Sequence, residues 1–454
     1  MRLADLRRGR TLVLGFGREG RSLERALRAQ APGADVHVLC DAEPAEKPAH
    51  WPLLADADAA RRLEPARVLR SPGVPLDHPA LVALRAPHRP VTCITSLWFG
   101  ERPDARVVAV TGSKGKSTTA ALIAHLLNGA GCRTALGGNI GVPMLELLDA
   151  DAAWFVVELS SYQLADLCGH ATVGAFTRLF PEHQDWHGSV EAYYAAKLRL
   201  VDRLAGRPLW FNGADPVLAD ALAGVAGARA VNVAGAPRVV DGALWRLGER
   251  VLTAPEWSLP GTHNLDNAAL ALAVAESIVG RIADAGGSLA SFRPLPHRMQ
   301  PVPGPVRARW INDSISTSPH ATLAALRACA GRPVLIVGGL ERGGDWQEVA
   351  AQVREQGLSG VVALPDNGVA IANVLAPAAA LPDERVRVAG TIEEAVNAAA
   401  ALCPEGEAVL LSPGAPSFPH FSDFEERGRR FAAAVDGLGG AAQGLRASGR
   451  WRSA

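Results

Sequence analysis

The segment that most constrains the fold is a glycine-rich turn set between an apolar run and a helical pattern. The turn, Thr111 to Thr119, follows the apolar run Val107–Val110 and precedes a helical pattern from Ala120 to Leu127. A strand, a tight turn and a helix N-terminus direct backbone N–H groups and the positive end of a helix dipole at an anion. Val110 stands where the usual pattern has its first glycine, so this is the shorter Thr-Gly-x-x-Gly-Lys-Ser form. We expect an α/β fold that binds a nucleoside triphosphate through Gly112, Ser113, Lys114, Gly115, Lys116, Ser117 and Thr118.

Length and charge narrow the class of protein. The chain has 454 residues, too many for one core, which predicts two or three domains. Lys plus Arg and Asp plus Glu are equal at 46 each, so no global field attracts nucleic acid or an anionic membrane. We expect a cytoplasmic protein without membrane insertion, because the chain shows neither an apolar signal core nor a membrane-spanning run. Six cysteines without paired spacing indicate reduced, buried thiols.

The first of three α/β blocks, residues 1–103, has the pattern of a dinucleotide-binding fold. A strand over Thr11–Leu14 leads into the G-x-G-x-x-G turn Gly15–Gly20. Asp41 ends a second strand about twenty residues later, where such folds place a ribose-binding carboxylate. Ser71 lies in a rigid turn that either contacts a ligand or is purely structural. A nicotinamide-dependent dehydrogenase would show the same pattern, and so would a glycine turn that binds no ligand.

The second block, residues 104–296, contains the triphosphate turn and several polar strand ends. Glu158 follows the buried strand Trp154–Val157, at the edge where open parallel sheets bind ligands and magnesium. A helix cap or an ion pair is the alternative role for this carboxylate. His183, shortly after another strand, is a candidate magnesium ligand or phosphate contact. Asn264 and Asn267 share the first turn of a long helix, which they could cap, or they could contact adenine or ribose.

The third block, residues 297–454, repeats the pattern of polar residues at strand ends. Three strand-like segments end in Asn312-Asp313-Ser314, in Gly338-Gly339 and in the run Ser412–Ser417. The carboxyl ends of parallel strands meet at one edge, so one ligand site is expected here. The chain is therefore predicted as α/β with three domains: a Rossmann-like domain, a central parallel sheet of the P-loop ATPase type and a C-terminal Rossmann-like domain.

In this order the motifs resemble the Mur ligase family of peptidoglycan synthesis, over nearly the whole chain. The triphosphate turn resembles the family's ATP loop, and the run from Glu158 to Gln163 resembles its magnesium-binding acid with the following serines. The run Gly261–Asn267 resembles its adenine-binding loop, and Pro296–Met299 resembles its hinge into the third domain. The segment from Leu411 to Gly428 resembles the loop that holds the incoming amino acid.

The resemblance implies an ATP- and Mg²⁺-dependent ligase that adds glutamate to UDP-N-acetylmuramoyl-L-alanine through an acyl phosphate. It implies a monomer whose catalytic residues are Lys116, Glu158, His183 and Lys197. Magnesium would be held by Ser117, Glu158, His183 and a carbamylated Lys197, although the residues alone place Lys197 on an exposed helix without a role. Further ATP contacts would be Asn264, Asn267, Arg298 and Asp313. The substrate-binding residues implied for the nucleotide sugar and glutamate are Gly17, Arg18, Asp41, Ser71, Asn139, Ser160, Thr317, Arg342, Ser417 and Phe424.

The amino-acid loop departs from the pattern of enzymes that add D-glutamate. Those enzymes have lysine after Asp-Ser, whereas this chain has Ile315, which cannot pair with a carboxylate. Arg342 replaces a second lysine, and a planar fork does not substitute for a point charge. We therefore expect the smaller branch that adds L-glutamate and leaves inversion to a downstream epimerase. D-glutamate addition is the main alternative; a folate polyglutamate ligase, a dehydrogenase and a non-catalytic nucleotide sensor are weaker ones.

Overall fold

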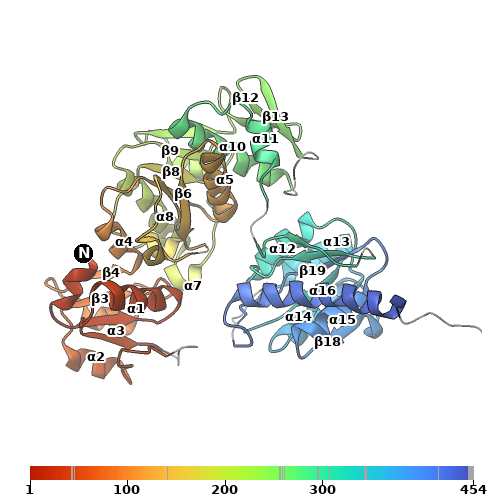
Figure 1. Cartoon of the computed structure of the whole chain (residues 1–454), viewed down its shortest axis with the longest axis horizontal. Helices are drawn as coiled ribbons and strands as arrows, with labels where there is room; N and C mark the ends of the chain where they lie inside the picture. Colours follow the sequence, from red (N-terminus) through yellow and green to blue (C-terminus); the bar gives the residue numbers. More distant parts are fainter. Residues whose placement is uncertain are drawn as a thin grey trace, which may run out of the picture. The chain divides into compact units, whose positions relative to one another are not determined.

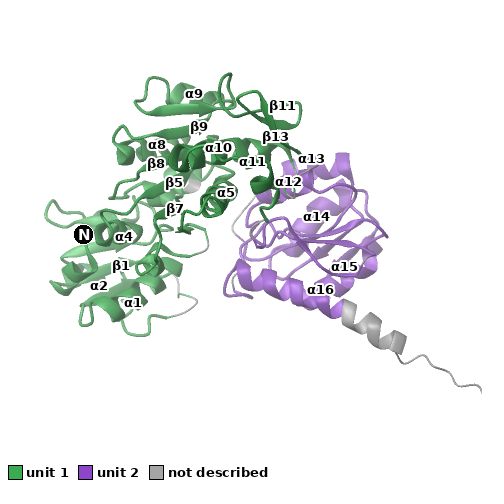
Figure 2. Cartoon of the chain, turned by 45° about the horizontal axis from the view of Figure 1, so that its top comes forward, with its two compact units in different colours: residues 1–293 green, residues 294–454 purple. Residues whose placement is uncertain are grey.

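The computed structural model describes the chain except residues 42–43, 45–46, 141, 255–256, 258, 260, 294–295, 306, 342–344, 418 and 448–454. The chain divides into two compact units, Met1–Arg293 and Pro294–Ala454 (Figure 2). Unit 1 includes both of the first two predicted blocks, so the predicted domain boundary at residues 103/104 stays a prediction. Within the described residues, no helix has the length and apolar character needed to cross a bilayer.

The first sheet of unit 1 is parallel, with strand order β2-β1-β3-β4. Its strands are β1 (Thr11–Leu14), β2 (Val36–Leu39), β3 (Arg67–Arg70) and β4 (Val91–Cys93). The helical segments here are η1 (Leu3–Arg7), α1 (Arg18–Gln30), α2 (Ala57–Leu63), α3 (Pro79–Leu84) and α4 (Thr95–Glu101). Helix α1 begins directly after Gly17, and a side chain at Gly20 in its first turn would collide with the ring of Phe16.

The second sheet of unit 1 is also parallel, in the order β10-β9-β8-β5-β7-β6. The strands are β5 (Val107–Thr111), β6 (Thr134–Gly138), β7 (Trp154–Glu158), β8 (Val173–Phe176), β9 (Leu209–Asn212) and β10 (Ala228–Val231). The helical segments are α5 (Lys116–Gly129), η2 (Met144–Leu147), α6 (Ser161–Leu164), α7 (Gln184–His187), α8 (Val190–Leu204), α9 (Pro216–Ala221), α10 (Thr262–Val279) and α11 (Ala285–Ala290). Helix α5 is buried on most sides because it packs against both this sheet and α10.

A three-stranded antiparallel meander completes unit 1 and was not predicted. It consists of β11 (Arg238–Val240), β12 (Ala243–Arg246) and β13 (Glu249–Thr253). Its contacts with α10 and α11 place it at the end of the unit away from the first sheet, as Figure 1 shows. Arg246, nearly fully buried, anchors the meander to α10 through an ion pair with Glu276.

Unit 2 is built on one six-stranded sheet in the order β14-β15-β19-β16-β17-β18, with only β14 antiparallel. Its strands are β14 (Gln300–Val302), β15 (Arg309–Asn312), β16 (Val334–Val337), β17 (Gly360–Ala363), β18 (Val386–Val388) and β19 (Ala408–Leu411). The helical segments are α12 (Pro319–Ala328), α13 (Gln347–Gln356), α14 (Gly368–Ala378), η4 (Asp383–Arg385), α15 (Ile392–Leu402) and α16 (Phe424–Ala447). Two parallel sheets and one mixed, mostly parallel sheet, each with helices, confirm the predicted α/β fold class.

The cysteines confirm part of the thiol prediction. All six are free. Cys93, Cys329 and Cys403 are buried as expected, whereas Cys168 is exposed. The expectation of buried thiols is therefore wrong at Cys168, in an exposed segment after the short helix α6, and is only partly met at Cys40 and Cys132, which are half-buried.

Candidate functional site

The triphosphate turn lies between β5 and α5, as the sequence predicts, although α5 begins at Lys116, four residues before the predicted helical pattern. Gly112 and Gly115 both have positive φ, +144° and +86°, a region that favours glycine. A side chain at Gly112 would collide with the hydroxyl of Thr177, and one at Gly115 would lie 2.5 Å from the amide oxygen of Asn267. The structure thus brings Asn267, together with its hydrogen-bonded neighbour Asn264, directly onto the turn.

Ser113 fastens this turn to the segment that precedes His183. Its hydroxyl donates to the carbonyl of Phe180 at 2.9 Å and accepts from the N–H of the same residue at 3.1 Å. It also accepts from the hydroxyl of Tyr193 at 2.9 Å. Lys116 donates to the carbonyl of Ser113 at 2.9 Å, and Lys114 pairs with Glu182 at 2.7 Å. Both lysines of the turn are therefore held at the same edge of the sheet as His183.

Lys197 is buried against the turn, which contradicts the expectation of an exposed helix. Only 2% of the residue is exposed, and Nζ donates to the carbonyl of Gly112 at 2.6 Å. Burial holds the pKa of Lys197 well below its ordinary value of 10.5, the charge of Lys116 lowers it further, and Glu182 and Glu158 oppose the shift. The buried residues of α8 show the signal that could have revealed this position: Tyr193, Ala196, Lys197, Leu200 and Leu204 recur at helical spacing.

Glu158 ends β7 with one carboxylate oxygen bonded and the other without a partner. Oε1 accepts from the side-chain amide of Asn139 at 2.8 Å, and the buried Oε2 has no hydrogen bond. The carbonyl of Asn139 in turn accepts from Arg18 at 3.0 Å, so three predicted site residues from two sheets meet here. An unpaired buried carboxylate oxygen is costly unless a donor or a cation completes it, which fits the predicted magnesium ligand.

His183 lies between β8 and α7 in the left-handed region, with φ +53°. Its Nδ1 lies 2.9 Å from the hydroxyl of Tyr162. Burial lowers the pKa of His183, and the charges of Lys197 and Lys116 lower it further, which favours the neutral ring that a metal requires. Within the described part of the chain, no three His, Cys, Asp or Glu side chains gather closely enough to hold a metal ion. The predicted set contains two such residues, Glu158 and His183, and depends on Ser117 and a modified Lys197 for the rest.

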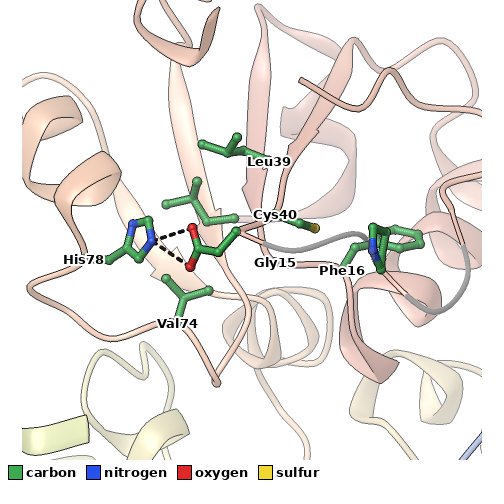
Figure 3. Close-up of a pocket in the computed structure, with 9 residues that line it drawn as sticks. Gly15, Phe16, Leu39, Cys40, Val74 and His78 are labelled. Carbon is green, nitrogen blue, oxygen red and sulfur yellow. Dashed lines mark hydrogen bonds and ion pairs between the residues drawn. The ribbon is translucent and has the colours of Figure 1, made fainter. Parts of the chain in front are cut away.

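A small cavity opens at the C-terminal ends of the first sheet's strands (Figure 3). Its volume is about 200 Å³, and its lining comprises Leu14, Gly15, Phe16, Leu39, Cys40, Asp41, Pro44, Val74 and His78. Asp41, the predicted ribose acid, is bonded to His78 at 2.9 and 3.0 Å. His78 was not predicted, because nothing in the sequence pattern links it to Asp41. The hydroxyl of Ser71 donates to the carbonyl of Gly15 and so shapes the glycine turn.

In unit 2, Asp313 and the end of β19 form a second polar edge. The carboxylate of Asp313 accepts hydrogen bonds from Ser412 at 3.0 Å, from Ser316 and from the N–H of Met299 at 3.1 Å. Burial raises the pKa of Asp313 to about 6, although these hydrogen bonds and the charge of Arg298 lower it. The structure thus places the predicted Asp313 and Arg298 near each other.

Arg427 of α16 links the ends of β15 and β19. Its fully buried guanidinium donates to the carbonyl and hydroxyl of Ser314, at 2.8 and 3.0 Å, and to the carbonyl of Ala415 at 3.1 Å. It pairs with no acidic group among the described residues. The hydroxyl of Ser314 also donates to the carbonyl of Phe424, so that predicted residue lies at the same edge, whereas Thr317 is exposed. Ser417 is buried nearby in sequence, and Arg342 lies outside the described residues.

The chain is similar to known proteins both in its domains and over nearly its full length. A family model described as "Mur ligase middle domain" matches residues 110–275, and "Mur ligase, glutamate ligase domain" matches residues 297–414. A protein of Xanthomonas euvesicatoria named UDP-N-acetylmuramoyl-L-alanine--L-glutamate ligase is 40% identical, over 97% of this chain and 100% of its own length. A Micromonospora protein of the same name is 42% identical, over 96% of this chain and 98% of its own.

Solved structures share the fold at low identity. The UDP-N-acetylmuramate-alanine ligase of Thermotoga maritima superposes with a TM-score of 0.60 at 18% identity, covering 94% of this chain and 99% of its own. The MurF ligase of the same organism, in complex with ADP, gives a TM-score of 0.58 at 15% identity and covers 97% of each chain. The near full-length match to relatives about 40% identical, together with the two domain matches, shows that this chain belongs to the Mur ligase family.

Proposed function

We propose that the chain is an ATP-dependent ligase that joins glutamate, in its L form, to UDP-N-acetylmuramoyl-L-alanine. One observation carries the proposal: a buried lysine, Lys197, contacts the triphosphate turn and shares its surroundings with the unpaired oxygen of Glu158. A lysine whose charge is disfavoured is available to react with carbon dioxide. The names of the relatives supply the substrates of the proposal.

Carbamylation would convert Lys197 from a buried amine into a metal ligand. The neutral amine attacks carbon dioxide, a C–N bond forms, and one proton leaves to solvent. The product is a carboxylate on a buried side chain, next to Glu158 and His183. Magnesium, held by Ser117, Glu158, His183 and this carbamate, would neutralise the charge of the phosphates during transfer.

The remaining residues of the turn would act on ATP directly. Backbone N–H groups at the start of α5 and the ammonium of Lys116 would hold the β- and γ-phosphates. Asn264 and Asn267, already on the turn, would contact the adenosine portion. The alanine carboxylate of the substrate attacks the γ-phosphorus and ADP leaves. The amine of glutamate then attacks the acyl phosphate, and phosphate leaves from the tetrahedral intermediate.

The cavity of the first sheet would receive the UDP group. Its apolar lining suits the flat face of a base, and Asp41 lies at a strand end where ribose hydroxyls are bound in related folds. Gly17, Arg18 and the N-terminus of α1 would hold the diphosphate, because a helix N-terminus favours anions. Asn139 and Ser160, next to Glu158, would then guide the sugar and its alanine towards the triphosphate turn.

The amino-acid edge of unit 2 supports an unusual handling of glutamate. Ile315 provides no charge there, whereas Arg427 provides a buried one, fixed behind Ser314 and Ala415. Ser417, Thr317, Phe424 and Arg342 remain proposed contacts. A pocket without the cation that D-glutamate-adding enzymes have at the position of Ile315 would pair the carboxylates of one enantiomer and leave a charge unpaired in the other, which discriminates strongly. With L-glutamate the product would need a separate epimerase. A monomer in the cytoplasm is part of the same proposal.

Phosphate release from ATP tests the proposal directly. The purified protein is assayed with UDP-N-acetylmuramoyl-L-alanine and either L- or D-glutamate, and the peptide product is identified by mass. We expect release that depends on all three substrates, with the higher kcat/KM for L-glutamate. Better use of D-glutamate would move the chain to the D-glutamate-adding class. Release with a folate substrate would indicate a folate polyglutamate ligase, and a change in the absorbance of reduced nicotinamide cofactor with a hydroxy acid would indicate a dehydrogenase.

A further inference from the structure

An aromatic stack lies between His183 and the first sheet. Tyr162 of α6 stacks on Trp186 of α7, with ring centroids 4.5 Å apart and planes inclined by 21°. The indole N–H of Trp186 donates to the carbonyl of Gly73 at 3.1 Å, and the guanidinium of Arg70 lies 5.4 Å from the indole ring. Both partners belong to the end of β3 and the turn after it. The plane of the Tyr162 ring is therefore fixed from the first sheet.

The hydroxyl of Tyr162 contacts the imidazole that the proposed function needs. It lies 2.9 Å from Nδ1 of His183 and leaves the second ring nitrogen, Nε2, on the other side of the ring. A neutral imidazole carries one N–H and one lone pair, so the partner of Nδ1 decides which of these Nε2 presents. Neither the family resemblance nor the similarity to known proteins assigns a role to this tyrosine.

We propose that Tyr162 is a positioning residue for His183: its phenol oxygen accepts the Nδ1 hydrogen and keeps Nε2 as a bare nitrogen that could bind a cation. The proposal rests on the proposed function, in which His183 is a magnesium ligand. Metal-bound histidines generally donate their second ring N–H to an oxygen, and removal of that oxygen weakens the metal site. The stack on Trp186 holds the oxygen in place before any metal binds.

The opposite direction of the Tyr162–His183 hydrogen bond has a different chemical consequence. If Tyr162 donated its proton to Nδ1, Nε2 would carry the hydrogen and could only donate, for example to a phosphate oxygen. The tautomer of His183 therefore distinguishes a metal ligand from a phosphate contact. Nitrogen-15 NMR of the whole protein labelled at histidine reads this tautomer directly. The signal among the twelve histidines is assigned by its loss in His183→Gln. We expect a protonated Nδ1; a protonated Nε2 would overturn the proposal.

Two of the chain's three tyrosines provide a variant and its matched control. Tyr162→Phe removes the hydroxyl and keeps the ring in the stack. Tyr194→Phe removes a hydroxyl from α8 that has no role in the site and serves as the control. Mn²⁺ is paramagnetic and shares the preference of Mg²⁺ for oxygen ligands, so it replaces Mg²⁺ here, and its binding in the presence of ADP is followed by electron paramagnetic resonance. We expect Tyr162→Phe to weaken Mn²⁺ binding by about 10- to 100-fold, and the control to change it by less than about two-fold.

The outcomes separate this inference from the proposed function. Wild-type ligation together with unchanged Mn²⁺ binding in a folded Tyr162→Phe refutes the role of Tyr162 alone. Absence of glutamate ligation by the wild type, with metal binding that still depends on Tyr162, refutes the proposed substrates and leaves the positioning role standing. Melting temperature reports folding of each variant, and the wild-type tautomer decides the matter even where a variant fails to fold.

Discussion

Two buried cations, Lys197 in unit 1 and Arg427 in unit 2, are both bonded to backbone carbonyls, yet their chemistry differs. Lys197 has a single short bond to the Gly112 carbonyl, and burial holds its pKa well below the ordinary value. Arg427 has three bonds from a rigid fork, and burial lowers its pKa only to about 9. A lysine can lose its charge and become a nucleophile, whereas a guanidinium at neutral pH stays charged. The comparison indicates a reactive cation in one unit and a permanent one in the other.

The largest expected effect is on ligation by Lys197→Ala. Loss of the proposed carbamate should lower kcat by about 100- to 1,000-fold, because a charge-stabilising group at the phosphates disappears. Acetate or formate should restore part of the rate by taking the place of the carbamate. Lys197→Arg should be as inactive as the alanine variant, since arginine keeps its charge and cannot be carbamylated. The exposed Arg199 of the same helix provides the control, Arg199→Ala. An active Lys197→Arg would show that only the positive charge matters.

Substitution of Arg427 should instead affect the binding of the substrate glutamate. Arg427→Gln removes the buried charge behind Ser314 and Ala415, and KM for glutamate should rise about ten-fold, equivalent to roughly 1.4 kcal/mol. KM for ATP and for the nucleotide sugar should change by less than about two-fold. Arg427→Lys keeps a positive charge and should therefore raise the KM for glutamate less than Arg427→Gln does. Arg430→Gln, on the same helix but paired with Glu393 at the surface, is the control. Equal increases in all three KM values would indicate a purely structural arginine.

The two cations should affect stability with opposite signs. The pKa of Lys197 in the folded protein lies below its ordinary value of 10.5. Between the folded-state pKa and 10.5 the folded protein binds fewer protons than the unfolded chain, so its stability rises with pH in that window. Lys197→Met should therefore be stabilising at neutral pH, and the gain should shrink as pH approaches 10.5. Arg427→Met should cost about 1–3 kcal/mol, because two buried carbonyls lose their donor. Denaturant unfolding at several pH values measures the free energy of unfolding of both variants. An Arg427→Met variant more stable than the wild type would contradict the predicted opposite signs.

The smallest expected effect concerns Asp313, which is buried beside the same edge as Arg427. Its folded-state pKa of about 6 lies above the ordinary 3.8, so the stability it contributes is fully present below 3.8 and is lost as pH rises through about 6. Asp313→Asn should remove this dependence and should be the more stable protein at neutral pH. The melting temperature followed from about pH 4 to about pH 7 tests this, and parallel curves for the two proteins would contradict it.

The sequence predicted what depends on neighbouring residues and missed what depends on packing. The apolar run before Gly112 and the glycine turn specify β5 and the presence of α5 locally, so both elements were predicted, although α5 begins at Lys116 rather than at Ala120. The meander β11-β12-β13 has little apolar alternation and was missed. Lys197 was placed at the surface because a charged side chain outweighed the apolar spacing of α8. The pairs Asp41–His78 and Tyr162–His183 join segments far apart in the chain, and no single-sequence pattern specifies such contacts. The roles assigned to the predicted site residues remain predictions.

The hydroxyl of Ser113 has one hydrogen and two lone pairs, and all three are used within the protein, by Phe180 and Tyr193. The conformation of the triphosphate turn is therefore set during folding, before any nucleotide binds. A loop that is already ordered loses little conformational entropy on binding, so more of its contact energy appears as affinity. We therefore expect Tyr193 to raise nucleotide affinity by preorganising the turn through its hydrogen bond to Ser113.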